Sequence, residues 1–227
     1  MNNIKKTGCL LIHGFGGRVE EVAPLACHLN KEGYDVVCPE LRGHTGNRQD
    51  LKGIKYQDWI SSAEKGLQGL LSKCDHVYLI GFSMGGLIAL NLASKYKVAG
   101  VVTLNSPIYY WDIKRIVLNI IEDIKKRKLE NIRHYLRSSS SFPLSALLNF
   151  RMLLSKTKPQ IKKVQCPVFV VQALEDDTVR KSSAQYIYKS AASNRKLIKY
   201  YEQSGHLILW SKAAAGVIQD VRSFLEE

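Results

Sequence analysis

The sequence of this 227-residue chain predicts an α/β fold, in which helices cover both faces of a mostly parallel β-sheet. Two observations support this fold class. Apolar runs of strand length alternate with segments whose apolar residues recur at helical spacing. The runs also lack the strict apolar–polar alternation of half-exposed strands, which indicates strands that are buried on both faces. The length suits a single large domain with a sizeable core.

The strands and helices follow one another along most of the chain. The expected strands are Thr7–Ile12, Tyr34–Cys38, His76–Ile80, Val98–Leu104, Val168–Val171 and Leu197–Tyr201. Between them, apolar residues recur at i, i+3, i+4 and i+7, which is the spacing of one helical face. These patterns predict helices over residues 22–29, 59–71, 182–189 and 217–225, and another that begins just after Ser83.

The alternation stops between residues 107 and 165, where no strand is expected. Ile113–Ile124 has the pattern of an amphipathic helix, and Pro143 is well suited to open a second helix over Leu144–Leu154. The second helix is apolar nearly all round, so it requires burial on several sides or an apolar ligand. We therefore expect an α/β core formed by residues 1–106 and 166–227, interrupted by a helical insertion over residues 107–165.

The formal net charge of +13 belongs mainly to this insertion. Residues 107–165 contain 13 basic residues against four acidic ones, so nine of the 13 surplus positive charges lie there. A basic chain raises the distant alternative of a module that binds nucleic acid or a membrane surface. The chain has no recognised nucleic-acid-binding motif, and no nucleic acid is expected as a partner. A solvated helix face explains the charge more simply than attraction of anionic substrates or lipid surfaces.

The five cysteines predict a reduced, cytoplasmic protein. Their number is odd, and no close pair has the spacing of a zinc site or a redox motif. The apolar stretch near the N-terminus is too short for a signal peptide, and no window approaches the length of a membrane-spanning helix. The oligomeric state is left open.

The motif Gly81-Phe82-Ser83-Met84-Gly85-Gly86 lies between the third strand and the following helix. A serine in this context is typical of a nucleophile elbow, in which the serine backbone is strained and nearby side chains would crowd the turn. A glycine turn without function is the alternative for the motif alone. A serine hydroxyl is a poor nucleophile at neutral pH, so it needs a histidine as general base and a carboxylate to orient that histidine.

Candidates for both partners follow the last two strands. Asp176 and Asp177 come after Val168–Val171, and His206 comes after Leu197–Tyr201. Because the carboxyl ends of parallel strands meet at one edge of a sheet, we expect Ser83, one of the two aspartates and His206 to lie together. Two other histidines, at positions 13 and 44, lie in glycine turns.

The loop His13-Gly14-Phe15-Gly16-Gly17, after the first strand, completes the expected site. Its glycines let backbone N–H groups approach a developing oxyanion, and the predicted donors are the amides of Phe15 and Met84. The loop lacks the spacing of a dinucleotide-binding motif, and the chain has no phosphate-binding GxxxxGK[ST] motif. No metal or organic cofactor is expected.

Together these motifs resemble those of the α/β-hydrolase superfamily over essentially the whole chain. The chain looks most similar to small bacterial carboxylesterases and monoacylglycerol lipases. The matching segments are His13–Gly17, Pro39–His44, Gly81–Gly86, Asp176 with Val179, and Gly205-His206. The resemblance implies an α/β-hydrolase fold whose insertion forms a small helical cap. The family's chain order of Ser, Asp and His fits either aspartate, and its Asp-x-x-Val pattern selects Asp176 rather than Asp177 as the acid. The resemblance implies no catalytic role for His13 or His44.

The resemblance implies a serine carboxylic-ester hydrolase that acts on short to medium acyl esters through Ser83, Asp176, His206 and an acyl-enzyme intermediate. Its expected partner is thus a small-molecule ester. A thioester, an amide or a C–C bond is the alternative substrate on the same scaffold. Apolar cap residues are expected to contact the acyl group, unless they simply form the core of the cap: Ile116, Ile120, Leu147, Leu148 and Met152.

Overall fold

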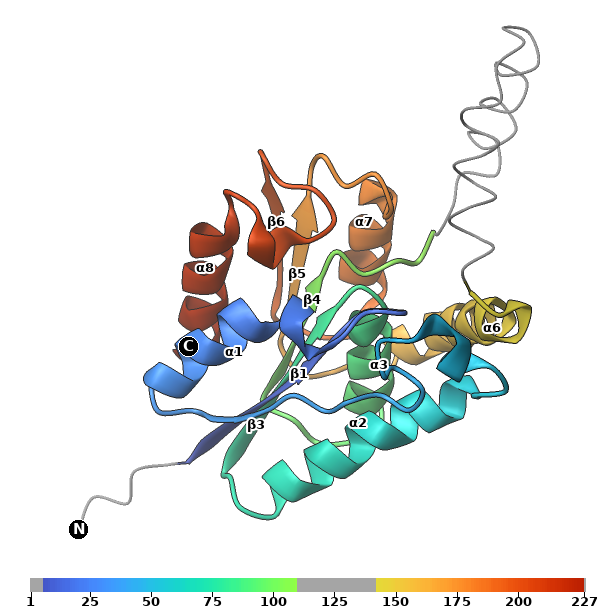
Figure 1. The fold of residues 1–227 in the computed structure, drawn as a ribbon. Helices are drawn as coiled ribbons and strands as arrows, with labels where there is room; N and C mark the ends of the chain where they lie inside the picture. Colours follow the sequence, from blue (N-terminus) through green and yellow to red (C-terminus); the bar gives the residue numbers. More distant parts are fainter. Residues whose placement is uncertain (1–5, 110–141, 227) are drawn as a thin grey trace, which may run out of the picture.

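The computed structural model describes residues 6–109 and 142–226, and the strands within these ranges form one six-stranded parallel sheet (Figure 1). The strands are β1 (Thr7–Ile12), β2 (Asp35–Val37), β3 (His76–Phe82), β4 (Gly100–Leu104), β5 (Val168–Ala173) and β6 (Lys196–Tyr201). Their order across the sheet is β2-β1-β3-β4-β5-β6, and each neighbouring pair is parallel. The predicted α/β fold is confirmed, and all six predicted strands are present.

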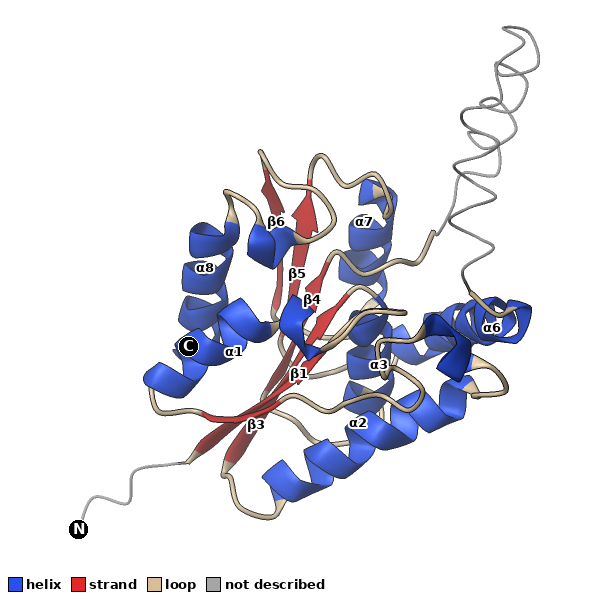
Figure 2. Cartoon of the chain, in the orientation of Figure 1, coloured by secondary structure: helices blue, strands red, loops and turns tan. Residues whose placement is uncertain are grey.

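Helices cover both faces of the sheet (Figure 2). They are α1 (Ala23–Lys31), α2 (Tyr56–Leu71), α3 (Met84–Ala93), α6 (Leu144–Ile161), α7 (Lys181–Ser190) and α8 (Ala214–Glu226), with short 3-10 turns at η1 (Val19–Glu21), η2 (Arg48–Leu51) and η3 (Ile208–Trp210). Helices α1 and α8 pack on one face with η3, whereas α2, α3, α6 and α7 pack on the other. Among the described residues, no helix is long and apolar enough to cross a membrane.

The core has two halves, one on each side of the sheet. Within β1, Leu10 and Ile12 belong to the half beneath α2 and α3, while Cys9 and Leu11 belong to the half beneath α1 and α8. All four side chains are fully buried. Successive strand residues point to opposite faces, so burial on both faces explains why the strands read as continuous apolar runs.

The ends of several elements differ from the prediction. β3 extends two residues further, to Phe82, because Gly81 and Phe82 pair with residues of β4. Helix α6 continues to Ile161, since Thr157 and Ile161 extend its buried face beyond the apolar run that marked it in the sequence. It packs on α3 and α2, and Asn91 of α3 donates a hydrogen bond to Thr157 (Nδ2 to Oγ1, 2.6 Å). The predicted helix 113–124 lies outside the described residues, and the division into core and cap stays a prediction.

Candidate active site

Ser83 occupies the sharp turn between β3 and α3. Its φ is 50° and its ψ is −119°, a strained conformation for a residue other than glycine. Its N–H donates to the carbonyl of Leu104 at 2.8 Å, which attaches the turn to the end of β4. The backbone strain that the elbow motif predicts is therefore present at this serine.

The glycines beside Ser83 leave no space for side chains. A Cβ at Gly81 would lie 2.3 Å from the backbone of Gly85, and a Cβ at Gly85 would lie 2.0 Å from the carbonyl oxygen of Ile12. Real Cβ atoms do not approach other atoms so closely. The start of α3 is thus packed directly against the end of β1, and this packing holds the turn against the loop that follows β1.

His206 bridges Ser83 and Asp176. Its Nε2 lies 3.1 Å from Ser83 Oγ, and its Nδ1 lies 2.9 Å from Asp176 Oδ2. These three residues follow β3, β6 and β5 at the carboxyl edge of the sheet, as the strand ends predicted. The Asp176 side chain is completely buried, while that of His206 is 21% exposed. The carboxylate is therefore shielded from water, whereas the imidazole can be reached from outside.

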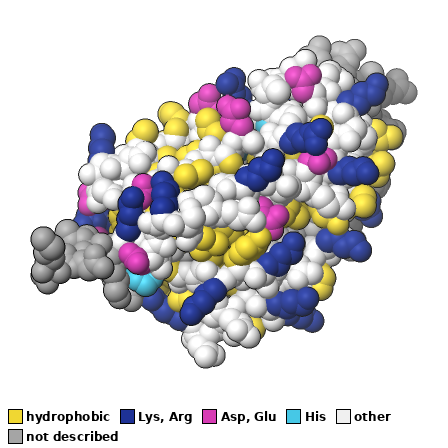
Figure 3. Space-filling model, turned by 90° about the horizontal axis from the view of Figure 1, so that it is seen from below, with side chains coloured by type: hydrophobic (Ala, Val, Ile, Leu, Met, Phe, Trp, Pro, Cys, Tyr) yellow, Lys and Arg dark blue, Asp and Glu magenta, His cyan; other side chains and the backbone are white. Residues whose placement is uncertain are grey.

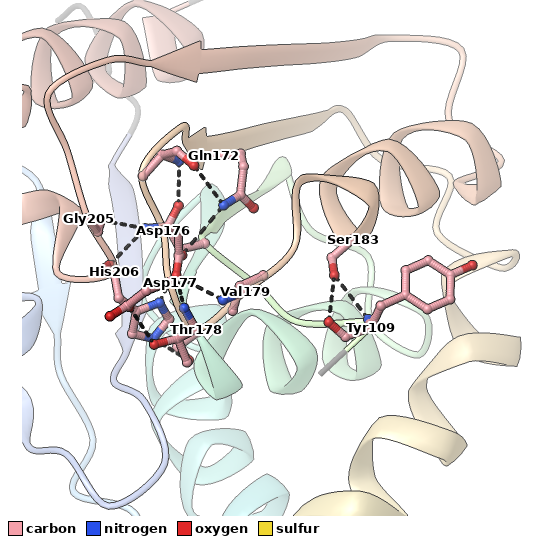
Figure 4. A network of polar contacts seen from close by, with 12 residues as sticks. Tyr109, Gln172, Asp176, Asp177, Thr178, Val179, Ser183, Gly205 and His206 are labelled. Atoms are coloured by element: carbon pink, nitrogen blue, oxygen red, sulfur yellow. Dashed lines mark hydrogen bonds and ion pairs between the residues drawn. The ribbon is translucent and has the colours of Figure 1, made fainter. Parts of the chain in front are cut away.

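Asp176 is held in place by the turn that follows it (Figure 4). Its Oδ1 accepts the N–H groups of Thr178 and Val179, each at 2.8 Å, and Gln172 Nε2 lies 3.5 Å from its Oδ2. Asp177 is exposed and accepts a hydrogen bond from the Thr178 hydroxyl instead. The structure thus brings Asp176, and not Asp177, into contact with His206. The amide of Val179 closes the turn, which gives the Asp-x-x-Val pattern a physical basis.

The two predicted oxyanion donors lie in the loop after β1 and at the first residue of α3. Within residues 6–109 and 142–226, no acceptor takes the N–H of Phe15 or of Met84. The neighbouring amides differ, because Gly14 N–H donates to Glu21 Oε2 at 2.8 Å and Gly17 N–H donates to the Gly14 carbonyl at 3.3 Å. The amides of Phe15 and Met84 are therefore available to a ligand, and their role as oxyanion donors stays a prediction.

Glu21 was not identified from the sequence. Its carboxylate lies against the loop so closely that a Cβ at Gly17 would be 2.2 Å from the carboxyl atoms. Burial raises the pKa of Glu21, and the hydrogen bond from Gly14 opposes this rise. In the sequence, Glu20 and Glu21 resemble two surface acids, so no signal marks the second one as a support of the loop.

His13 begins the same loop, and the ring of His44 packs against it. His13 accepts the Leu41 N–H on Nε2 at 3.3 Å, and its Nδ1 lies 3.0 Å from the Gly14 carbonyl. Its ring packs against that of His44 with a centroid distance of 5.0 Å. Burial lowers the pKa of His13, and it lowers the pKa of His44 to about 4, to which repulsion by His13 contributes. Both residues are buried, and the expectation that neither is a catalytic base stays a prediction.

The aromatic ring of Phe15 packs against α6. It stacks on Phe142, just before the helix, and on Phe150, with centroid distances of 4.9 and 5.0 Å. The predicted acyl contacts in α6 lie elsewhere on the helix, since Leu148 is 53% and Met152 48% exposed, while Leu147 is partly buried. Ile116 and Ile120 lie outside the described residues. The apolar pattern of α6 identifies a helix, but it does not indicate which of its side chains contact the loop. The predicted contacts between these residues and an acyl group stay predictions.

Metal chemistry has no visible site in the described part of the chain. No group of three or more His, Cys, Asp and Glu side chains in residues 6–109 and 142–226 is arranged to hold a metal ion. All five cysteines fall within these ranges and are unpaired.

The profile of the alpha/beta hydrolase family matches residues 9–220. The chain belongs to the alpha/beta hydrolase family. It is 29% identical over 225 residues to a carboxylesterase of Bacillus subtilis (strain 168), a match that covers 96% of this chain and 92% of that protein. It is 28% identical over 211 residues to a thermostable monoacylglycerol lipase of Bacillus sp. (strain H-257), covering 88% of this chain and 82% of the lipase. The resemblance inferred from the motifs is confirmed.

Solved structures of alpha/beta hydrolases share the fold. One structure, from work on the metagenome-derived lipolytic enzymes LipS and LipT, matches with a TM-score of 0.83 at 19% identity and covers 98% of this chain and 94% of that one. A soluble variant of the monoglyceride lipase of Saccharomyces cerevisiae matches with a TM-score of 0.72 at 21% identity, covering 100% and 88% of the two chains. At these identities the matches establish the alpha/beta hydrolase fold alone.

Proposed function

We propose that this protein is a serine carboxylic-ester hydrolase that works through an acyl-enzyme intermediate. The observation that carries the proposal is His206, whose two ring nitrogens lie within hydrogen-bond distance of a strained serine and of a buried carboxylate. This is the arrangement by which a serine hydroxyl is activated for nucleophilic attack. The names of its two Bacillus relatives, a carboxylesterase and a monoacylglycerol lipase, support an ester as the substrate.

In the acylation step, Ser83 Oγ attacks the carbonyl carbon of the ester while His206 Nε2 takes its proton. Asp176 keeps the proton of His206 on Nδ1 and stabilises the imidazolium that forms. The amides of Phe15 and Met84 donate to the oxyanion of the tetrahedral intermediate, and each such donor lowers the barrier by about 3 kcal/mol. His206 then protonates the leaving alcohol, and the acyl group remains on Ser83.

In the deacylation step, the same groups act on water. His206 Nε2 takes a proton from a water molecule, which attacks the acyl carbonyl, and the intermediate collapses as the proton returns to Ser83 Oγ. The product is a carboxylic acid. The residues named above supply every protein group that the two steps require. Short to medium acyl esters are the proposed substrates. A cytoplasmic location is part of the proposal, supported by the five unpaired cysteines.

Hydrolysis of p-nitrophenyl butyrate by the Ser83→Ala variant tests the proposal. Because the nucleophile is removed, we expect turnover to fall to the level of the remaining oxyanion and binding contributions, at least about a thousandfold below the parent protein. Ser94→Ala is the matched control, since Ser83 and Ser94 flank the two ends of α3 and the Ser94 hydroxyl donates to the Asn91 carbonyl. Full activity in Ser83→Ala would overturn the proposed mechanism.

A fluorophosphonate probe and a panel of esters separate the alternative chemistries. We expect the probe to label Ser83, and the panel to reveal turnover that varies with acyl length and with the alcohol. Labelling of Ser83 together with inert acyl esters would contradict the ester assignment and direct attention to thioesters, amides or C–C bonds. Loss of labelling in His206→Ala is expected as well, because the serine then lacks its base.

A further inference from the structure

Strand β4 contributes no member of the Ser83–His206–Asp176 set, yet its last residues contact the segments that carry all three. The carbonyl of Leu104 accepts the N–H of Ser83 at 2.8 Å. The next residue, Asn105, uses its side chain to reach the loops after β5 and β6. The end of β4 therefore lies at the centre of the candidate active site without supplying a group that reacts.

The side-chain amide of Asn105 joins two loops that are distant in sequence. Its Oδ1 accepts the N–H of Ala173 at 2.7 Å, at the start of the loop that carries Asp176. Its Nδ2 donates to the carbonyls of Gly205 at 3.2 Å and of His206 at 2.7 Å. One planar group thus positions the backbone of the histidine relative to the backbone that leads to its carboxylate.

The surroundings of Asn105 leave little freedom for another residue. It is completely buried, its own N–H donates to the Val171 carbonyl at 2.9 Å, and its φ is 48°. Asparagine is one of the few residues other than glycine that adopts such a φ readily. Only a side-chain amide of this length offers both an acceptor for Ala173 and two donors for the histidine loop, because a carboxylate cannot donate.

We propose that Asn105 is a positioning residue for the hydrolytic reaction. By holding the carbonyls of Gly205 and His206, it keeps the imidazole where Nε2 reaches Ser83 and Nδ1 reaches Asp176. This inference rests on the proposed function of Ser83 and His206 as nucleophile and base. It predicts an effect on the chemical step rather than on substrate binding, because Asn105 is buried beneath the loops.

The test compares two variants of Asn105 with one matched control. Asn105→Asp keeps the size of the side chain and the acceptor for Ala173 but removes the donors to the histidine loop. Asn105→Gly removes the whole side chain while glycine accepts the positive φ. The control is Asn91→Asp, since Asn91 is also buried and also donates two hydrogen bonds, to the Leu87 carbonyl and to Thr157 Oγ1 in the interface between α3 and α6.

We expect kcat for p-nitrophenyl butyrate to fall about a hundredfold in both Asn105 variants, because a displacement of a catalytic group by about 1 Å has an effect of this size. KM should stay within about twofold of the parent value, since the contacts that bind the substrate equally in the ground state and in the transition state are unchanged. All variants are assayed at a temperature where circular dichroism shows them folded. Asn91→Asp should retain its kcat even where its melting temperature falls as far as that of Asn105→Asp.

A spectroscopic signal separates positioning from general stability. The proton between His206 Nδ1 and Asp176 gives a downfield resonance in proton NMR, which should disappear in both Asn105 variants and persist in Asn91→Asp. The proposal is overturned if folded Asn105→Asp and Asn105→Gly keep the parent kcat, or if Asn91→Asp loses as much kcat as they do. Should Asn105→Asp fail to fold, Asn105→Gly decides. Failure of the proposed function would appear separately, as undiminished turnover in Ser83→Ala.

Discussion

The two oxygens of the Asp176 carboxylate have different tasks. Oδ1 accepts the backbone amides of Thr178 and Val179, so only Oδ2 is directed to His206. The side chain is completely buried, and a charge in such a place requires hydrogen bonds on every side. The orientation of His206 therefore depends on a carboxylate that is itself oriented by a turn.

Replacing Asp176 by asparagine should abolish most activity without removing the turn. The asparagine oxygen would accept the two turn amides, so its NH₂ group would face His206 Nδ1 and favour the tautomer that cannot accept the Ser83 proton. Under the proposed mechanism we expect kcat to fall about 10⁴-fold, as this change does in a Ser-His-Asp triad. In Asp177→Asn, the exposed control, we expect an effect within about twofold. Steady-state kinetics decide, and the reverse ranking would make Asp177 the acid.

His44 should make the fold sensitive to acid. Burial lowers the pKa of His44 to about 4 from a usual value of 6.5. Between these two pH values, His44 is therefore protonated in the unfolded chain but stays neutral in the folded one. The free energy of unfolding therefore falls as the pH decreases from 6.5 towards 4, with a contribution of about 2 kcal/mol from His44 between pH 7 and pH 5.

Urea denaturation at the two pH values, in the parent protein and in His44→Gln, measures this contribution. The variant carries no titratable group at position 44, so its loss of stability between pH 7 and pH 5 should be smaller than that of the parent by about 2 kcal/mol. An equal loss in both proteins would mean that the buried imidazole does not control this transition.

Single residues differ in how far the sequence reveals them. Ser83 and His206 stand in local motifs at strand ends, and both could be predicted from position. Asp176 could be separated from Asp177 by a family pattern, whose physical cause is a turn that forms within three residues. Asn105 could not be predicted, because its partners lie up to 101 residues away and an asparagine after a strand has no local signature.

The turn between β3 and α3 depends on close contact between elements rather than on any one hydrogen bond. The absence of a side chain at Gly85 lets the first turn of α3 approach the carbonyls of Ile12 and His13. The strand that presents Ser83 and the strand that leads to Phe15 are thereby held at a fixed distance. The position of Ser83 relative to the loop that carries Phe15 is a property of this packing.

A methyl group at position 85 should disrupt the packing. Because it would lie 2.0 Å from the Ile12 oxygen, we expect Gly85→Ala to lower the free energy of unfolding by about 3 kcal/mol and to reduce kcat. Gly69→Ala in α2 is the control, since nothing lies within 4 Å of its Cβ position, and alanine there should stabilise the helix by about 1 kcal/mol. Thermal melts and kinetics of both variants test the pair, and a neutral Gly85→Ala would show that the turn can relax.

At the level of elements, type and order could be predicted, but lengths could not. The apolar runs identify every strand, whereas the end of β3 depends on pairing with β4, which is a tertiary property. Similarly, α6 extends beyond its apolar run because Thr157 finds a hydrogen-bond partner in Asn91. Contacts between elements set these boundaries, and a linear pattern does not contain them.

At the scale of the whole molecule, the positive net charge is unevenly divided along the chain. On the face seen from below, Lys and Arg side chains are spread among apolar and acidic ones rather than gathered in one patch (Figure 3). Residues 1–106 and 166–227 carry only four of the 13 surplus positive charges. Net charge bears on solubility and on association, not on the fold, and the groups that form the candidate active site are independent of it.

The hydrogen bond between His206 and Ser83 joins residues that are 123 positions apart. Closing such a distance is entropically costly, and sheets built from distant parallel strands form slowly. Helices can appear early in folding, but this contact requires β3, β5 and β6 to be aligned in one sheet. During synthesis Ser83 is made 123 residues before His206, so a growing chain that has not reached His206 carries the serine without the base that the proposed function assigns to it.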